Sequence, residues 1–163
     1  MDIKPEKKRA FKKQQGTTTV EFSIVAAVIF IVLFAVMEFG RLIYNWAMLN
    51  ESSRQAVRMA AVCMPDERQA VADDVAARLD IAMGSFNGSN INIRYLTDGM
   101  ATVSNPQTNL NAIRYVQASI VNYTFQPILP LPTNLAIQSP DFTTTLRAES
   151  LGRTTSGDIP CFP

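Results

Sequence analysis

An uninterrupted apolar stretch near the N-terminus constrains this chain more than any other feature. From Phe22 to Met37 every residue but one is apolar, and no proline or glycine breaks the run. A helix needs about twenty such residues to cross the hydrocarbon core of a bilayer. Counting from Thr17 reaches that length, although it places Glu21 in lipid. The pattern therefore predicts a continuous transmembrane helix over residues 17–40.

Charge is distributed unevenly along the 163 residues. Residues 1–16 carry a net charge of +4 while the whole chain carries +1, so the remainder is −3, and it contains no lysine. A basic segment before a membrane helix is typical of a cytoplasmic N-terminus that contacts anionic lipid. The acidic remainder lacks the clustered Lys and Arg that nucleic acid binding needs. We expect residues 1–16 in the cytoplasm, residues 41–163 as a body outside it, and no nucleic acid partner. The basic residues of the first segment are Lys4, Lys7, Lys8, Arg9, Lys12 and Lys13.

The apolar run does not end like a cleaved secretory signal. Such a signal needs small residues at a cleavage site after the run, whereas this run ends in Met37-Glu38-Phe39-Gly40-Arg41. A simple signal anchor leaves Glu21 unexplained, because a carboxylate near the centre of a membrane helix costs about 2.5–3.5 kcal/mol. Glu21 either extends toward the cytoplasmic headgroups or is neutralised by a positive partner.

A positive partner for Glu21 arises if the chain is cleaved after Gly16. Thr17 then has a free α-amine four residues before Glu21, which on the same or a neighbouring chain would neutralise the carboxylate and set the register between subunits. Basic residues, Gly16, Thr17-Thr18-Thr19-Val20-Glu21-Phe22 and an apolar run resemble the class III signal of type IV pilins and pseudopilins. In that family a prepilin peptidase cuts after the glycine, and glutamate is the fifth mature residue, as at Glu21. Thr17 departs from the phenylalanine usual in type IVa pilins.

The following segment narrows this resemblance. Glu38-Phe39-Gly40-Arg41-Leu42-Ile43-Tyr44, then Leu49 and Arg54-Gln55-Ala56-Val57-Arg58-Met59-Ala60, are similar to the TadE-like minor pilins of tight-adherence (Tad/Flp) pilus systems. The similarity extends over roughly residues 9–62, and a TadF-like relative shares the signal. The resemblance implies a prepilin peptidase, TadF-like and Flp-like pilin or pseudopilin subunits and an inner-membrane Tad assembly platform as partners. No cofactor is expected.

The helix is expected to leave the lipid near Glu38 to Arg41 and to continue in water to about Cys63, where Pro65 ends it. The helix has a charged face, with Glu51, Arg54 and Arg58, which is either solvated or used in assembly contacts. One apolar stripe follows helical spacing and predicts the face that packs on the body. Its residues are Leu42, Trp46, Leu49, Ser53, Ala56, Ala60 and Cys63.

The body combines a second helix with strands. Asp66 and Glu67 favour the start of a helix, and Gly84 favours its end. The apolar face of this helix consists of Val71, Val75, Leu79 and Met83. Alternation of apolar and polar residues predicts strands, and a proline-containing connection separates the last two. The strands are Ile91–Tyr95, Ala101–Ser104 after a turn at Asp98-Gly99, Arg114–Phe125 and Phe142–Glu149, and the connection holds Pro127, Pro130 and Pro132. The apolar residues of Arg114–Phe125 change face midway, which a bulge or burial on both faces would explain. The prediction is an α+β, pilin-like body with a three- or four-stranded antiparallel sheet on the long helix.

Cysteine and histidine content limits the chemistry. Cys63 and Cys161 are the two cysteines, and there is no histidine, which excludes histidine-dependent triads and HExxH zinc sites. Two thiols alone make a poor structural zinc site, so no metal is expected. In an exported body a disulfide is the natural interpretation, and two separate thiols are the alternative.

Three classes of function remain. The first is a minor pilin or pseudopilin, cleaved after Gly16 and used to initiate or tip a Tad/Flp pilus for surface adherence. It resides in the inner membrane with its body in the periplasm, and reaches the cell surface on assembly. The second is a permanently anchored periplasmic binding module. The third, an extracytoplasmic enzyme, has no supporting pair of carboxylates.

Overall fold

The computed structural model describes residues 16–83, 85–128, 136–155 and 157–162. Its contacts divide the chain into two units, Met1–Met37 and Glu38–Pro163. Three expectations lie outside the described residues: the basic segment before Gly16, the helix stop at Gly84, and the connection containing Pro130 and Pro132.

Helix α1 spans Thr17–Val62, one residue displaced at each end from the prediction. The predicted apolar stripe is confirmed: its residues from Leu49 onward are buried, and Leu42 and Trp46 are half-buried. The helix ends where Met64 adopts an extended backbone before Pro65, because the proline ring clashes with a helical residue before it.

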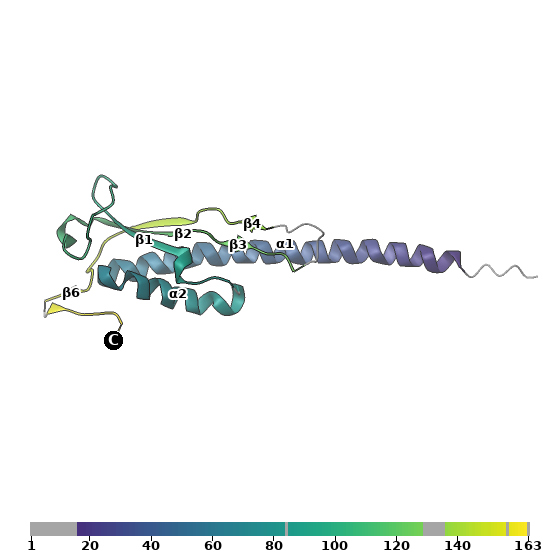
Figure 1. Cartoon of the computed structure of the whole chain (residues 1–163), viewed down its shortest axis with the longest axis horizontal. Coiled ribbons are helices and arrows are strands. Elements are labelled where there is room, and N and C mark those ends of the chain that lie inside the picture. Colours follow the sequence, from purple (N-terminus) through teal and green to yellow (C-terminus); the bar gives the residue numbers. More distant parts are fainter. Residues whose placement is uncertain (1–15, 84, 129–135, 156, 163) are drawn as a thin grey trace, which may run out of the picture. The chain divides into compact units, whose positions relative to one another are not determined.

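Helix α2 spans Arg68–Met83 and follows a 3-10 turn over Pro65–Glu67. The predicted face of this helix is buried at Val71, Val75 and Leu79. In Glu38–Pro163, α2 and the main sheet lie on different sides of the C-terminal part of α1 (Figure 1).

The main sheet is antiparallel with strand order β1-β2-β5. Its register places Ile93 opposite Ala118 and Ala118 opposite Thr144. Two short pairs, β3 with β4 and β6 with β7, complete the strands of the described residues. The strand bounds are β1 Ile91–Leu96, β2 Tyr115–Ile120, β3 Thr124–Phe125, β4 Ile137–Gln138, β5 Thr143–Arg147, β6 Arg153–Thr154 and β7 Gly157–Asp158. The α+β class is therefore confirmed.

The predicted strand Ala101–Ser104 is wrong, although the turn before it exists. Thr97 and Ala101 close the turn through a backbone hydrogen bond of 2.8 Å. After one isolated bridge between Leu96 and Thr102 the chain leaves β1. Asn105 has a positive φ of 52° and the following proline has no N–H, so extended pairing cannot continue.

The predicted long strand Arg114–Phe125 is two strands instead of one bulged strand. β2 ends at Ile120, and Asn122 has a positive φ of 55°, which redirects the chain into β3. The Asn90 side chain donates to the carbonyl oxygens of Val121 and Asn122 at 3.1 and 3.3 Å and holds this corner. The change of apolar face in the sequence therefore marks a change of sheet.

A single core joins α1, α2 and the strands within Glu38–Pro163. Its largest fully buried side chains include Tyr95, Phe86, Phe125 and Leu49. Polar contacts cross it too: the hydroxyls of Ser53 in α1 and Thr144 in β5 are 2.9 Å apart. The part of α1 beyond Glu38 therefore lies at the centre of the body's core.

Candidate functional site

The residues predicted for peptidase cleavage lie at the start of α1. Gly16 precedes the helix in a bend, Thr17 is its first residue, and both are exposed. The first amides of a helix have no partner within it, so the Thr17 N–H donates no hydrogen bond within α1. Glu21, one turn further, is also exposed, and none of the described residues forms an ion pair with it.

The N-terminal half of α1 exposes large apolar side chains. Its most apolar stretch has a mean hydropathy of 2.8 and is not buried anywhere in the structure. By length and composition α1 can cross a membrane, and an apolar surface of this extent belongs in lipid or against other apolar helices. The exposed residues include Val20, Phe22, Ile24, Val28, Ile31, Leu33, Phe34, Val36, Met37 and Phe39.

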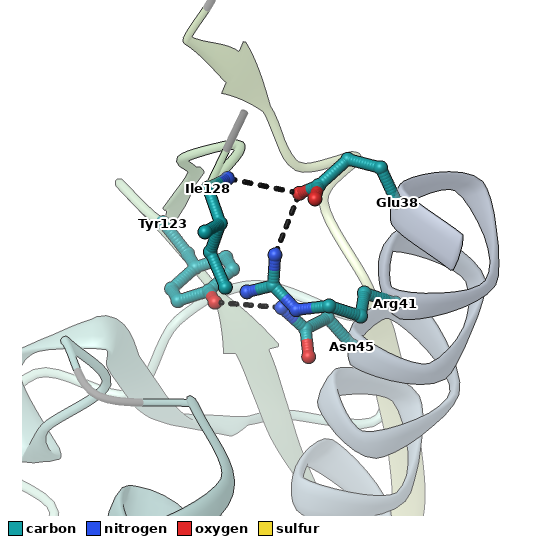
Figure 2. Close-up of polar contacts among 5 residues, drawn as sticks. All are labelled: Glu38, Arg41, Asn45, Tyr123 and Ile128. Atoms are coloured by element: carbon teal, nitrogen blue, oxygen red, sulfur yellow. Dashed lines mark hydrogen bonds and ion pairs between the residues drawn. The ribbon is translucent and has the colours of Figure 1, made fainter. Parts of the chain in front are cut away.

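Polar and aromatic side chains gather where this apolar half ends. We call Glu38, Arg41, Asn45, Tyr123, Phe125 and Ile128 the exit cluster. Its three α1 residues lie on successive turns and face the segment around β3 (Figure 2). One carboxylate oxygen of Glu38 accepts from the Arg41 guanidinium at 2.6 Å and from the Ile128 N–H at 3.2 Å. Glu38 therefore connects the helix to a segment ninety residues away.

Arg41 and Asn45 complete the exit cluster. The Arg41 guanidinium lies over the Phe125 ring, 5.3 Å from its centroid, an attractive cation–π arrangement. The Asn45 amide donates to the Tyr123 hydroxyl at 3.4 Å. Burial raises the pKa of Tyr123, and the opposing effects of the Arg41 charge and the Asn45 hydrogen bond do not cancel it. The Tyr123 hydroxyl is therefore neutral at physiological pH.

The comparison with known families gives a match that covers most of α1. Residues 16–58 match the family model of TadE-like proteins. The expected resemblance to TadE-like proteins is confirmed over that segment. No curated protein and no solved structure matches the chain.

The matched TadE-like segment contains both the predicted cleavage residues Gly16 and Thr17 and the α1 half of the exit cluster. Between Glu38 and Arg41, Phe39 is 64% exposed, and a side chain at Gly40 would meet no atom within 4 Å. Glycine within a helix costs about 0.8–1 kcal/mol relative to alanine. No neighbour within the described residues requires a glycine here. The small residue leaves the backbone of this turn open to close approach.

The charged face of the TadE-like segment is solvated. Arg54 and Arg58 are exposed and Glu51 is half-buried. The described residues contain two ion pairs, Glu38–Arg41 and Asp74–Arg78, and neither involves this face. Both arginines therefore remain available to a partner, and the assembly alternative stays a prediction.

Beyond the TadE-like segment, a clamp holds the chain near Cys161. The sulfurs of Cys63 and Cys161 are bonded at 2.08 Å, with Cα atoms 5.5 Å apart. The Glu67 carboxylate accepts from the backbone N–H groups of Cys161 and Phe162 at 3.0 and 3.1 Å, and from Met64 N–H at 3.3 Å. Burial acts to raise the pKa of Glu67, but these three donors outweigh it and lower the pKa.

A metal does not fit this clamp. Cys63, Glu67 and Cys161 form the one group of three potential ligands found among the described residues. Both sulfurs are committed to the disulfide, and a metal-binding cysteine must be a thiolate. The carboxylate already accepts three backbone hydrogen bonds, so the group serves structure.

Sequence reasoning missed half of the exit cluster and the role of Glu67. Glu38 and Arg41 stand out as charges beside an apolar run. Tyr123, Phe125 and Ile128 carry no comparable signal, because only the packing of β3 against α1 brings them there. Glu67 resembles any acidic residue in a first helical turn until its partners near Cys161 are known.

Proposed function

We propose that this chain is a minor pilin or pseudopilin of a Tad/Flp-type pilus. A prepilin peptidase cuts it after Gly16, the apolar half of α1 first holds it in the inner membrane, and the same half then packs among the helices of other subunits. The body in the periplasm is carried to an initiating or tip position. The protein acts through assembly and not through catalysis.

The observation that carries this proposal is the unburied apolar half of α1 within the TadE-like match. The buried core of Glu38–Pro163 is built without it, since the first residue of that core is Leu49. An apolar helix that its own chain leaves uncovered requires lipid or other helices as its environment. A pilin is surrounded by lipid before assembly and by the helices of other subunits after it.

Glu21 and Gly40 support packing against other subunits. A permanently lipid-embedded anchor gains nothing from a carboxylate, which costs about 2.5–3.5 kcal/mol near the centre of the span. An α-amine of a cleaved neighbour would neutralise Glu21 and fix the axial register between two chains. The open turn at Gly40 lets a second helix approach closely, as small residues do in membrane helix pairs.

The exit cluster defines where the lipid-exposed part ends. Arg41 and the Glu38 carboxylate, with the neutral Tyr123 beside them, have the chemistry that anchors helices at a membrane–water interface. Because Glu38 also binds the Ile128 N–H, the body is held at a fixed height on α1. In a filament this contact would keep the body outside the helix bundle.

The mature N-terminus tests the proposal. In the native host, mass spectrometry of the protein is expected to find a chain that begins at Thr17, and Gly16→Ala is expected to leave residues 1–16 attached. An intact N-terminus in wild-type protein from piliated cells would contradict the proposal. It would favour the permanently anchored binding module.

A second test separates insertion from assembly. Glu21→Ala should leave the membrane-bound amount unchanged and reduce recovery of the protein in sheared pili at least severalfold. Asp141→Ala, which removes an exposed carboxylate from the body, is the control and should leave both amounts unchanged. Equal pilus incorporation of the Glu21→Ala and wild-type proteins would refute the role of Glu21.

A further inference from the structure

The body has a second charged feature, at the end of the main sheet that adjoins the C-terminus of α1. A concavity of about 230 Å³ lies between the 3-10 turn Leu110–Ala112, the end of β5 and the segment that leads into β6. Three arginines line it together with one carboxylate, one amide and one hydroxyl. These residues are Arg114, Arg147, Arg153, Glu149, Asn111 and Ser150.

The charge of this concavity opposes that of the chain around it. Three guanidinium groups stand against one carboxylate, whereas the chain beyond residue 16 carries a net charge of −3. Arg114, Arg147 and Arg153 are exposed, and the two ion pairs of the described residues, Glu38–Arg41 and Asp74–Arg78, lie elsewhere. Like charges that outnumber their single counter-charge repel one another, and an anion would relieve that repulsion.

The backbone around the concavity is fixed before any ligand arrives. Ala148 N–H donates to the Arg114 carbonyl at 2.9 Å, and Glu149 N–H donates to the Ala61 carbonyl at the end of α1 at 3.1 Å. One guanidinium is positioned as well, because Arg153 donates to the Asn111 side-chain oxygen at 3.3 Å. A preorganised set of donors loses less entropy on binding than a mobile one.

The mixture of groups selects the kind of anion. Guanidinium forks bind carboxylates in two parallel hydrogen bonds. The Glu149 carboxylate accepts hydrogen bonds but repels an anion, so it suits a ligand that carries hydroxyls beside its negative group. The Asn111 amide adds N–H donors, and the Ser150 hydroxyl, which donates to the Val62 carbonyl at 3.2 Å, adds an acceptor. A bare phosphate satisfies the arginines and conflicts with Glu149.

Size favours a small ring over a protein partner. A volume near 230 Å³ is below the range of about 300–1,000 Å³ typical of drug-sized ligands. A stable protein interface buries more than about 1,000 Å² around an apolar, aromatic-rich centre, and the lining has no aromatic residue. We propose that this concavity binds a uronic acid residue, either as the free sugar acid or as a unit of an acidic polysaccharide.

Titration of the full chain in neutral detergent micelles tests the proposal. The probe is galacturonic acid at physiological salt, compared with galactose and with inorganic phosphate, and binding is followed by calorimetry or by ligand-detected NMR. Galacturonic acid should bind at least tenfold more tightly than galactose, because charge-assisted hydrogen bonds are the stronger ones. Equal binding of the two sugars would overturn the proposal, as would phosphate binding as tight as that of galacturonic acid.

Variants locate the site. Arg147→Gln and Arg153→Gln should each weaken galacturonic acid binding about tenfold, and Arg94→Gln, an exposed arginine on β1 outside the lining, should leave it unchanged. Circular dichroism melts confirm that each variant is folded. Equal weakening by Arg94→Gln would show general charge attraction and refute the site.

Two further measurements identify the selecting group and the source of the ligand. Glu149→Ala removes the hydrogen-bond acceptor together with the negative charge, so it should strengthen phosphate binding more than galacturonic acid binding. Equal strengthening of the two would remove the argument for a hydroxylated anion. Polygalacturonate immobilised on a sensor should retain the protein if the ligand is a polymer unit. Competition by free galacturonic acid at its own Kd must release the protein, and failure to do so would place the polymer on a different surface.

Discussion

Removal of the disulfide gives the most quantitative prediction of the structure. Cys63 and Cys161 are 98 residues apart in sequence and enclose nearly all of the body. In the chain-entropy model, a crosslink that closes a loop of this length stabilises the fold by about 4.7 kcal/mol through its effect on the unfolded chain. Cys161 is exposed, so Cys161→Ser removes little packing. We expect a loss of about 3–5 kcal/mol.

Pulse proteolysis in urea measures this loss on the full chain in detergent micelles, where the body unfolds and the apolar helix stays embedded. With a slope of about 2 kcal/mol per molar urea, the midpoint of Cys161→Ser should lie about 2 M below that of the oxidised wild type. A reducing agent should shift the wild type by the same amount. It should leave Cys161→Ser unchanged, which is the control.

The reasoning fails if the midpoint shift is below about 0.5 M, corresponding to roughly 1 kcal/mol. It also fails in its mechanism if the Phe162 amide becomes freely exchanging in the reduced protein. Glu67 still accepts from that amide without the disulfide, so a bridge that acts on the unfolded chain should leave native protection at Phe162 in place.

Three further predictions concern single side chains and pH. Burial raises the pKa of Tyr95 to about 12 and leaves its hydroxyl without a hydrogen-bond partner in the described structure. Tyr95→Phe should therefore raise the free energy of unfolding in urea by about 1 kcal/mol. A loss of more than about 1 kcal/mol would contradict the absence of a partner for this hydroxyl. Gly152 has a φ of +77° in space that another side chain already occupies, so Gly152→Ala should destabilise by about 1–3 kcal/mol, whereas Gly99→Ala, with ample space, should be near neutral in the same assay. The pKa of Glu67 is lowered in the folded state, so its contribution is present above the ordinary carboxyl pKa and is lost as pH falls through the folded value. Amide exchange at Phe162, corrected for intrinsic rates, should therefore lose protection on acidification in wild type, while Glu67→Gln should show weak protection at every pH.

The helices were predictable because their signals are local. The period of the apolar stripe fixed the buried face of α1, and Pro65 fixed its end within one residue. The strands β1 and β5 likewise follow from the alternation of apolar and polar residues. These elements need no knowledge of what lies opposite them.

The strand pairing and the corner after β2 were not predictable in the same way. A turn at Asp98-Gly99 favours a local hairpin, yet β1 pairs with β2, whose residues follow about twenty positions later. The break at Asn122 depends on the Asn90 side chain, which binds the corner from another part of the chain. Such tertiary hydrogen bonds leave no periodic pattern in the sequence.

The residues of the candidate site also fall into those that local sequence predicts and those that only tertiary packing brings together. We identified Gly16, Glu21, Glu38 and Arg41 because each differs in residue type from the apolar or basic run beside it. The partners of Glu38 and Arg41 in the body come from β3 and the segment after it, and no pattern in α1 specifies which strand it meets. The arginine-lined concavity is likewise assembled from three separate segments of the sheet end.

The end of α1 has a consequence for the order of folding. The carbonyl oxygens of Ala61 and Val62, the last in the helix, accept from the N–H groups of Glu149 and Gly152 at 3.1 and 2.6 Å. These donors, like the sulfur of Cys161, lie about ninety residues downstream, and contacts of such separation form late. The helix that is synthesised first is therefore finished last. The Cys63–Cys161 bridge joins the same two distant segments, so it holds the chain around Cys161 at the end of α1 once the two have met.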